Sequence, residues 1–406
     1  MRIVFPIIFA TIIVALFGFI EILLIRTLNK VWWHYKPVKW AAILLPVFGI
    51  VSILMWLVGF LIQVPIIYGF GATATALTLV MLLALMLSLP FSGILNQIHR
   101  WIEKRKGVRP KNGIDEKRRI FLKGTAAALP IITLSLGTGG IAGSFGRTKV
   151  YIRQMAFENL PSQLEGLKIL HLTDSHLGMY KYPVHIEEIL VDAQKFEPDL
   201  VLLTGDIADE LSLLPEILKL ISESNPRYGV YAVLGNHEYY RGIREVRWIY
   251  DRSPVPLLVG SGVAIDINGA SLYIAGADDP KTMRGDISKF LRNTIEKSIA
   301  GAPSDSFRVL MSHRPEAFDH VGDLGIPLTL SGHTHGGQIG VGGRSFFESL
   351  MPGRYLWGEY RNSLAQMYLS AGIGHWFPFR LGCPPEAPII KIISNQSLNK
   401  KIISSV

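Results

Sequence analysis

The sequence predicts an α/β domain of layered sheets, preceded by an all-α membrane region of three or four helices. Three observations predict this division. Long uncharged runs fill the first third of the chain, short apolar runs alternate with helical segments after residue 167, and the basic excess lies before residue 143. Of the 406 residues, 49% are hydrophobic and 18% are charged, whereas soluble proteins carry about 25% charge. The composition favours a membrane protein and excludes a disordered chain.

Three apolar runs, at 3–25, 41–62 and 64–94, predict the membrane region. A helix needs about 20 apolar residues to cross a bilayer, and each run is long enough. Tryptophans stand just outside the runs, where an aromatic belt is expected, at Trp32, Trp33, Trp40 and Trp101. Residues 1–94 are therefore predicted to form three transmembrane helices, in preference to buried core helices.

The charge distribution predicts how these helices are oriented. Residues 1–142 contain 15 Lys and Arg against 4 Asp and Glu, while residues 143–406 contain 26 against 28. The basic residues lie in the loop 26–39 and the segment 95–123, and basic loops stay in the cytoplasm. The N-terminus is then outside. Because the net charge of +9 is explained by these loops, no nucleic-acid partner is expected.

The end of the basic segment resembles a twin-arginine export signal. Residues 117–123 read KRRIFLK, and the stretch 124–145 is moderately apolar and rich in Gly, Ala and Thr. The resemblance implies the twin-arginine translocase as a partner. The alternative is a basic anchor followed by a fourth membrane span. If 124–145 crosses a bacterial cell membrane, the domain after it is extracytoplasmic, which we expect; if it does not cross, the domain is cytoplasmic.

The domain predicted at 150–395, before a tail at 396–406, shows strands alternating with helices. Helical periodicity appears at 183–196, 211–224, 240–250 and 286–300. Short apolar runs followed by turn residues predict buried strands at 167–174, 199–206, 229–236, 272–277, 307–313, 327–333, 366–372 and 387–394. Strands alternate with helices early in the domain, and the later part contains mostly strands. This pattern predicts sheets that are covered by helices on the outside.

Five of these strands are followed by side chains that bind metals. Ligands at the carboxyl ends of strands meet in one crevice of an α/β fold. The oxygen and nitrogen donors fit Mn²⁺, Fe or Zn²⁺, and the single Cys383 excludes a cysteine-based cluster. Seven ligands suit two divalent ions about 3.5–4 Å apart that share one carboxylate. The candidate ligands are Asp174, His176, Asp206, Asn236, His313, His333 and His335.

The order of these blocks resembles the calcineurin-like metallophosphoesterase superfamily over about 167–394. Along the chain the blocks are D-x-H, G-D-x-x-D, G-N-H-E, H and G-H-x-H. The resemblance implies a four-layer α/β/β/α sandwich. Residues 371–374 and 384–386 also resemble the bacterial membrane-anchored branch, which is similar to UDP-2,3-diacylglucosamine hydrolases and cell-wall phosphoesterases.

By position, the resemblance also implies how the ligands are shared. The first ion would be held by Asp174, His176 and His335, and Asp206 would bridge the two ions. The second ion would be held by Asn236, His313 and His333. His237 would lie beside the scissile phosphate as the catalytic residue, stabilising charge or protonating the leaving oxygen.

We therefore expect a membrane-anchored enzyme that hydrolyses a phosphomonoester, phosphodiester or pyrophosphate bond with a metal-bridging hydroxide, on a lipid-linked or cell-envelope substrate. Arg314 and Arg380 are candidates for binding substrate phosphate. Asp209 and Glu238 are interpreted as residues that orient the site, and His375 as a packing residue. The alternatives are a non-catalytic metal-binding envelope protein and a membrane sensor or transport protein with an accessory phosphoesterase domain.

Overall fold

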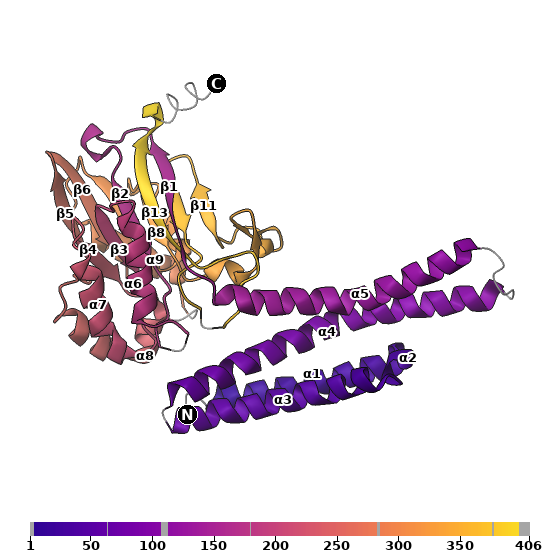
Figure 1. Cartoon of the computed structure of the whole chain (residues 1–406). Coiled ribbons are helices and arrows are strands. Elements are labelled where there is room, and N and C mark those ends of the chain that lie inside the picture. The colour runs from indigo at the N-terminus through magenta and orange to yellow at the C-terminus, as the bar shows by residue number, and fades with distance from the viewer. Residues whose placement is uncertain are drawn as a thin grey trace. The chain divides into compact units, whose positions relative to one another are not determined.

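A computed structural model describes residues 4–62, 64–106, 113–178, 180–281, 285–375 and 377–397 (Figure 1). The chain divides into two units, Met1–Gly143 and Ser144–Val406. The first unit is helical and the second contains the sheets, as the sequence predicts.

The helices of the first unit cover the predicted apolar runs. They are α1 Val4–Leu28, α2 Lys30–Trp33, α3 Lys36–Leu61, α4 Pro65–Lys106 and α5 Gly113–Ser144. Four segments are long and apolar enough to cross a membrane: Ile7–Leu28, Lys36–Leu61, Ile66–Ile98 and Lys123–Ser144. The predicted export signal at 117–123 lies inside α5, but the side chains of Arg118 and Arg119 lie outside the described residues.

Small residues and one buried amide hold these helices together. Because Gly71 has no side chain, α4 can lie against the backbone of Trp56 in α3. Asn29, which is 2% exposed, donates a hydrogen bond to the carbonyl of Leu89 (3.1 Å) and accepts one from Asn96 (2.8 Å). In lipid, helix association depends on such close packing and polar contacts, because the lipid tails are as apolar as the helix surfaces.

The second unit contains two mixed sheets and one short hairpin. The strand orders are β1-β13-β2-β3-β4 and β11-β12-β8-β7-β6-β5, with the hairpin β10-β9 apart. The first sheet comprises β1 Lys149–Phe157, β2 Lys168–Leu172, β3 Leu200–Thr204, β4 Val230–Val233 and β13 Glu386–Ser394. The second comprises β5 Ser261–Ile267, β6 Ala270–Gly276, β7 Phe307–Met311, β8 Leu328–Ser331, β11 Gly358–Arg361 and β12 Gln366–Leu369. The hairpin strands are β9 Gly340–Val341 and β10 Arg344–Ser345.

Alternating side chains in these strands build four layers. Leu200 and Leu202 of β3 pack between the two sheets, while Val201 and Leu203 pack under the helices α6 Pro183–Gln194, α7 Leu214–Glu223 and α8 Asn236–Tyr250. In the second sheet, Leu310 of β7 packs on its outer side with Ile295 of the helix α9 Ile287–Ile299. Both faces of each sheet are therefore buried, and the predicted α/β/β/α sandwich is confirmed.

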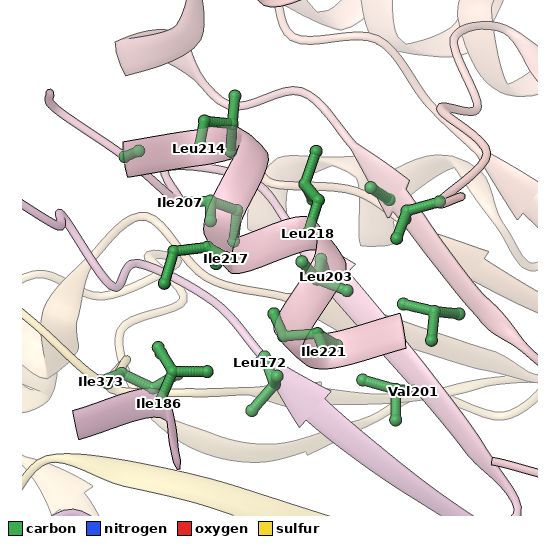
Figure 2. Packing of buried hydrophobic residues seen from close by; sticks show 14 of the residues in the cluster. Leu172, Ile186, Val201, Leu203, Ile207, Leu214, Ile217, Leu218, Ile221 and Ile373 are labelled. Carbon is green, nitrogen blue, oxygen red and sulfur yellow. The ribbon is translucent and has the colours of Figure 1, made fainter. Parts of the chain in front are cut away.

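Helix α7 shows why the apolar spacing of the sequence becomes a helix on a sheet. Its buried residues Leu214, Ile217, Leu218 and Ile221 follow the i, i+3, i+4, i+7 spacing that places side chains on one face. Figure 2 shows this face packed with Leu203 of β3 and Leu172 of β2. Short 3₁₀ turns complete the unit: η1 Ser162–Leu164, η2 Leu211–Leu213, η3 Pro315–His320, η4 His335–Gln338 and η5 Phe346–Ser349.

The structure contains strands that the apolar pattern does not predict. β1, β5 and β11 lie at sheet edges, and residues such as Arg153 in β1 are exposed to solvent. An edge strand has only one neighbour and tolerates polar side chains, so its apolar pattern is weak. Helix α8 also begins at Asn236, four residues before the predicted start at 240. This early start puts Asn236 and His237 in the first helical turn.

Ile217→Ala should lower the free energy of unfolding of the detergent-solubilised protein by about 2–5 kcal/mol, because it leaves a cavity under a helix that is packed on the sheet. Ile217 is 0% exposed. Urea unfolding measures the change. Lys219→Ala on the exposed face of α7 is the control, expected to change stability by no more than about 0.5 kcal/mol. Equal losses of unfolding free energy in Ile217→Ala and Lys219→Ala would contradict this packing.

Candidate metal centre

The candidate ligands lie where strands end at one side of the sandwich. Asp174 and His176 follow β2, Asp206 follows β3, and Asn236 follows β4. His313 follows β7, while His333 and His335 follow β8. Five of these seven residues have positive φ: Asp174, His176, Asp206, His333 and His335. A non-glycine residue held in this region costs about 1–3 kcal/mol, and such strain clusters at functional sites.

The side chains form two groups. In the first ligand group, Asp174, His176 and His335, the two imidazole Nε2 atoms are 3.2 Å apart, and Nε2 of His335 is 3.4 Å from Oδ1 of Asp174. The second ligand group contains His313 and His333, whose facing nitrogens are 3.2 Å apart, and Asn236, whose Oδ1 is 3.2 Å from Nε2 of His313. Each group therefore points several donor atoms at a common point.

Asp206 lies between the two groups. Its Oδ2 is 3.2 Å from Nε2 of His313 and 3.8 Å from Nε2 of His176. Its Oδ1 accepts a hydrogen bond from the backbone N–H of His237 (2.8 Å). One carboxylate oxygen thus reaches both groups while the other is held by the start of α8.

The charges of the site favour bound cations. Burial alone would lower the pKa of His176, but Asp209, Asp206 and Asp174 raise it to about 9. Burial also opposes the charge on His313, whose pKa Asp206 and Asp174 raise to about 10. Burial opposes ionisation of Asp206, yet the neighbouring imidazoles hold its pKa below its usual range. Metal ions supply positive charge in place of such protons, so the residues fit divalent cations.

Hydrogen bonds to the backbone fix the ligand geometry. Nδ1 of His313 lies 2.8 Å from the carbonyl of Thr204, which leaves Nε2 facing Asp206. The backbone N–H of His333 donates to both carboxylate oxygens of Asp174 (3.1 and 3.0 Å). Partners of this kind select the ring nitrogen that binds metal and orient the ligand.

Glu238 joins the Asp206 turn to helix α8, in agreement with its interpretation as an orienting residue. Its carboxylate is 1% exposed and accepts hydrogen bonds from the N–H groups of Asp206 (2.9 Å), Ile207 (2.8 Å) and Gly235 (2.8 Å). Gly235 allows this close approach, since a Cβ there would lie 2.8 Å from the Asp206 nitrogen. The G-N-H-E block therefore provides both a candidate ligand and the contact that positions Asp206.

His237 lies at the edge of this centre with one ring nitrogen held. Its Nδ1 is 2.6 Å from Oδ1 of Asp209, and its side chain is 18% exposed. Asp209 also contacts Nδ1 of His176 at 3.4 Å and Nε of Arg241 at 3.1 Å. Asp209 thus orients a ligand of the first group and the candidate catalytic histidine together.

The two arginines predicted to bind substrate phosphate are buried and contact other parts of the site, and their binding of substrate stays a prediction. Arg314, 3% exposed, donates from Nε to Asp279 (2.8 Å) and contacts Nε2 of His333 through Nη1 (2.7 Å). Arg380, 2% exposed, donates from Nη2 to the carbonyls of Ala371 (2.8 Å) and Gly374 (2.5 Å). The contacts of both side chains help to hold parts of the site in place, although Nε of Arg380 has no hydrogen-bond partner among the described residues.

Asp279 is a site residue that the sequence reasoning missed. It is 1% exposed, and it positions Arg314 and, through that side chain, His333. A signal was present, because Asp279 follows the predicted strand at 272–277 as the ligand blocks follow theirs. Its neighbour Asp278 adds a second carboxylate, but the pair matches none of the five ligand blocks, so the pattern alone carries little information.

Comparison with known proteins agrees with this geometry. Residues 167–337 match the family model described as calcineurin-like phosphoesterase. A protein of Aquifex aeolicus named an uncharacterized metallophosphoesterase is 31% identical, over 58% of this chain and 88% of its own length. The chain belongs to the calcineurin-like phosphoesterase family.

Two further relatives extend the comparison. An uncharacterized metallophosphoesterase of Helicobacter pylori is 31% identical over 56% of this chain, and the match spans 60% of that protein. A protein of Danio rerio named a transmembrane protein with metallophosphoesterase domain is 28% identical over 66% of this chain and 62% of its own length. The four apolar helices and this relative agree with the predicted membrane protein.

Asp206→Ala should lower the metal content of the purified protein more than loss of any single histidine, because one Asp206 oxygen reaches both ligand groups. Inductively coupled plasma mass spectrometry after loading with Mn²⁺ measures the metal per chain. Asp305→Ala changes an exposed carboxylate outside the centre and should retain the wild-type content. Wild-type metal content in Asp206→Ala would contradict the bridging position.

Proposed function

We propose that this protein is a membrane-anchored phosphoesterase that uses two divalent metal ions, Mn²⁺, Fe or Zn²⁺. The observation that carries the proposal is the Asp206 carboxylate between two groups of imidazole ligands, with His237 beside it. The first ion would be held by Asp174, His176 and His335. The second would be held by Asn236, His313 and His333, with Asp206 shared between them.

Bound ions would activate a water molecule and neutralise the phosphate oxygens of the ester. The protein contributes the arrangement of the donors. Thr204 turns Nε2 of His313 toward Asp206, and Asp174 holds the backbone at His333. Preorganised groups of this kind lower the barrier because they need little rearrangement during the reaction.

His237 is proposed to act on the phosphate or on the leaving oxygen. The carboxylate of Asp209 accepts the Nδ1 proton, so Nε2 is the ring atom left for the substrate. When the ring is protonated, Nε2 donates to the leaving oxygen, and Asp209 stabilises the positive charge of the ring. A carboxylate that fixes the orientation and tautomer of a histidine plays the same part in other hydrolases.

The contact pattern favours catalysis over a structural metal site. Asp174, His176 and His335 are no more than 4% exposed, whereas the neighbouring His237 side chain is 18% exposed. A purely structural site is closed by its ligands. The partly open His237, oriented by Asp209 but absent from the two ligand groups, supports a position for a substrate.

His237→Ala should lower kcat/KM for bis-p-nitrophenyl phosphate by about 10²–10⁴-fold, since a general acid contributes on that scale. The reaction is followed by release of nitrophenolate with Mn²⁺ present, and EDTA should abolish it. His320→Ala is the matched control, because His320 lies on η3 and contacts Ser288 outside the centre.

Metal-loaded protein that hydrolyses no phosphate ester would overturn the enzymatic proposal. Such a result would favour a metal-binding protein without catalysis. Wild-type activity in His237→Ala would leave the metal centre in place but remove His237 from the reaction.

We further propose that the phosphoesterase unit lies outside the cytoplasm and acts on a lipid-linked or cell-envelope phosphate ester. The support is the basic loop 26–39 and the basic segment 95–123, together with an apolar helix at Lys123–Ser144 that is long enough to cross the membrane. The twin-arginine translocase is the proposed partner for export, because residues 117–123 resemble its signal.

Cysteine labelling in intact cells tests this orientation with little background, because the single native cysteine, Cys383, is 0% exposed. A membrane-impermeant maleimide should label Lys289→Cys, an exposed position on α9, but should not label Lys36→Cys in the basic loop. Both should react after lysis. Labelling of Lys36→Cys alone in intact cells would place the domain in the cytoplasm.

A further inference from the structure

A buried group of basic side chains lies beside the metal centre. Lys181, His375 and Arg380 are 3%, 1% and 2% exposed, and we refer to them as the basic cluster. None of the three forms an ion pair with a carboxylate among the residues that the structure describes. Buried cations are normally paired, because removal from water strongly penalises an isolated charge.

Each of the three members of the basic cluster has a donor position without a hydrogen-bond partner among the described residues. The ammonium of Lys181 makes no hydrogen bond to any described residue. Both ring nitrogens of His375 lack a partner, as does Nε of Arg380, although the other guanidinium nitrogens of Arg380 bind carbonyls. Since more than nine-tenths of buried polar groups are satisfied in proteins, three such atoms together indicate a missing acceptor.

The chain connects the basic cluster directly to the first ligand group. The N–H of Gly374, the residue before His375, donates to the carbonyl of Asp174 (2.7 Å). Nη2 of Arg380 lies 3.4 Å from Nδ1 of His335. The carbonyl of Lys181 accepts from Gly178, two residues after His176 (2.9 Å). The basic cluster therefore adjoins the side of the centre formed by Asp174, His176 and His335.

Positive charge outweighs negative charge around Lys181 and His375, whereas the carboxylates of Glu386 and Asp174 act on Arg380. Burial lowers the pKa of Lys181, and the charge of Arg380 lowers it further against a smaller opposing effect of Glu188. Burial and the charges of Arg380 and Lys181 lower the pKa of His375 to about 2. The three groups thus repel one another's charge, and an anion placed among them would relieve that repulsion.

Aromatic rings define the outer side of the basic cluster. The ring of His375 packs against Tyr180 at 4.9 Å and against the edge of Phe145 at 5.8 Å, centroid to centroid. Phe145 is 47% exposed, so this wall reaches the surface of the unit. His375 therefore packs on an aromatic wall whose outer ring, Phe145, is open to solvent.

We propose that Lys181 and His375 bind a phosphate group adjacent to the metal centre. In the enzyme this group is the second phosphate of a diphosphate-containing substrate, whose scissile phosphate lies at the metal centre. The proposal that phosphate binds here depends on the basic cluster alone. The proposal that this phosphate belongs to a diphosphate substrate also rests on the proposed phosphoesterase function.

Calorimetric titration of inorganic phosphate into the full-length, detergent-solubilised, EDTA-treated protein tests the anion site without the metal ions. Lys181→Met keeps the length and apolar stem of the side chain but removes its charge, and it should weaken phosphate binding by about tenfold or more. Lys219→Met is the control, because Lys219 is an exposed lysine on α7 (73% of its side chain), and it should bind as the wild type does.

A thermal scan separates loss of binding from loss of the fold. Without phosphate, Lys181→Met should unfold at the wild-type temperature or above it, because it removes an unpaired buried charge. With phosphate, the wild type should gain more stability than Lys181→Met, since binding to the folded state adds to the general stabilising effect of the salt. His375→Phe keeps the ring packing and should also gain less than the wild type. The proposal would be overturned if phosphate did not raise the unfolding temperature of the wild type. It would also be overturned if phosphate raised the unfolding temperature of Lys181→Met by the same amount.

Inhibition of the metal-loaded enzyme identifies the source of the phosphate. Methylenediphosphonate should inhibit hydrolysis of bis-p-nitrophenyl phosphate at concentrations at least tenfold lower than inorganic phosphate, and Lys181→Met should abolish that difference. Equal inhibition by the two compounds in the wild type would contradict a diphosphate substrate. If the protein binds phosphate but hydrolyses no ester, the anion site stands and the proposed phosphoesterase function fails.

Discussion

The site depends on one carboxylate placed between two groups of imidazoles. Asp206 is 2% exposed and stands in a positive-φ turn at the end of a fully buried strand. Glu238 holds the N–H of that turn, and the N–H of His237 holds one of the Asp206 oxygens. The remaining oxygen reaches His176 on one side and His313 on the other. If Asp206 moved, both ligand groups would lose their common member.

The sandwich makes this placement rigid. Adjacent parallel strands β2, β3 and β4 end together, so Asp174, Asp206 and Asn236 meet at one edge of the first sheet. Strands β7 and β8 are also parallel and carry the histidines of the second sheet to the same region. Because each strand is buried on both faces, a shift of one strand by a residue would move apolar side chains to the wrong layer. Packing thus fixes the metal centre.

The sequence predicts which candidate ligands meet at the strand ends, but not the hydrogen-bond partners that surround them. Candidate ligands of the D-x-H and G-H-x-H type recur after apolar runs, so strand ends and candidate ligands can be predicted together. The sequence predicts Arg314 and Arg380 as substrate-binding residues, but residue type alone does not show that they donate hydrogen bonds to Asp279 and to backbone carbonyls. The sequence favours His375 as a packing residue, and its ring does pack against Tyr180. Its two unpartnered ring nitrogens are visible only in the three-dimensional structure. Edge strands such as β1 escaped prediction because one side of an edge is open to solvent.

The shared carboxylate is tested most directly by the electron paramagnetic resonance spectrum of the full-length protein loaded with Mn²⁺. Two ions that share Asp206 should lie about 3.5–4 Å apart and give the spectrum of a spin-coupled manganese pair. Asp206→Ala should lose that coupled signal. A wild-type spectrum of isolated Mn²⁺ at full loading would contradict a metal centre bridged by Asp206.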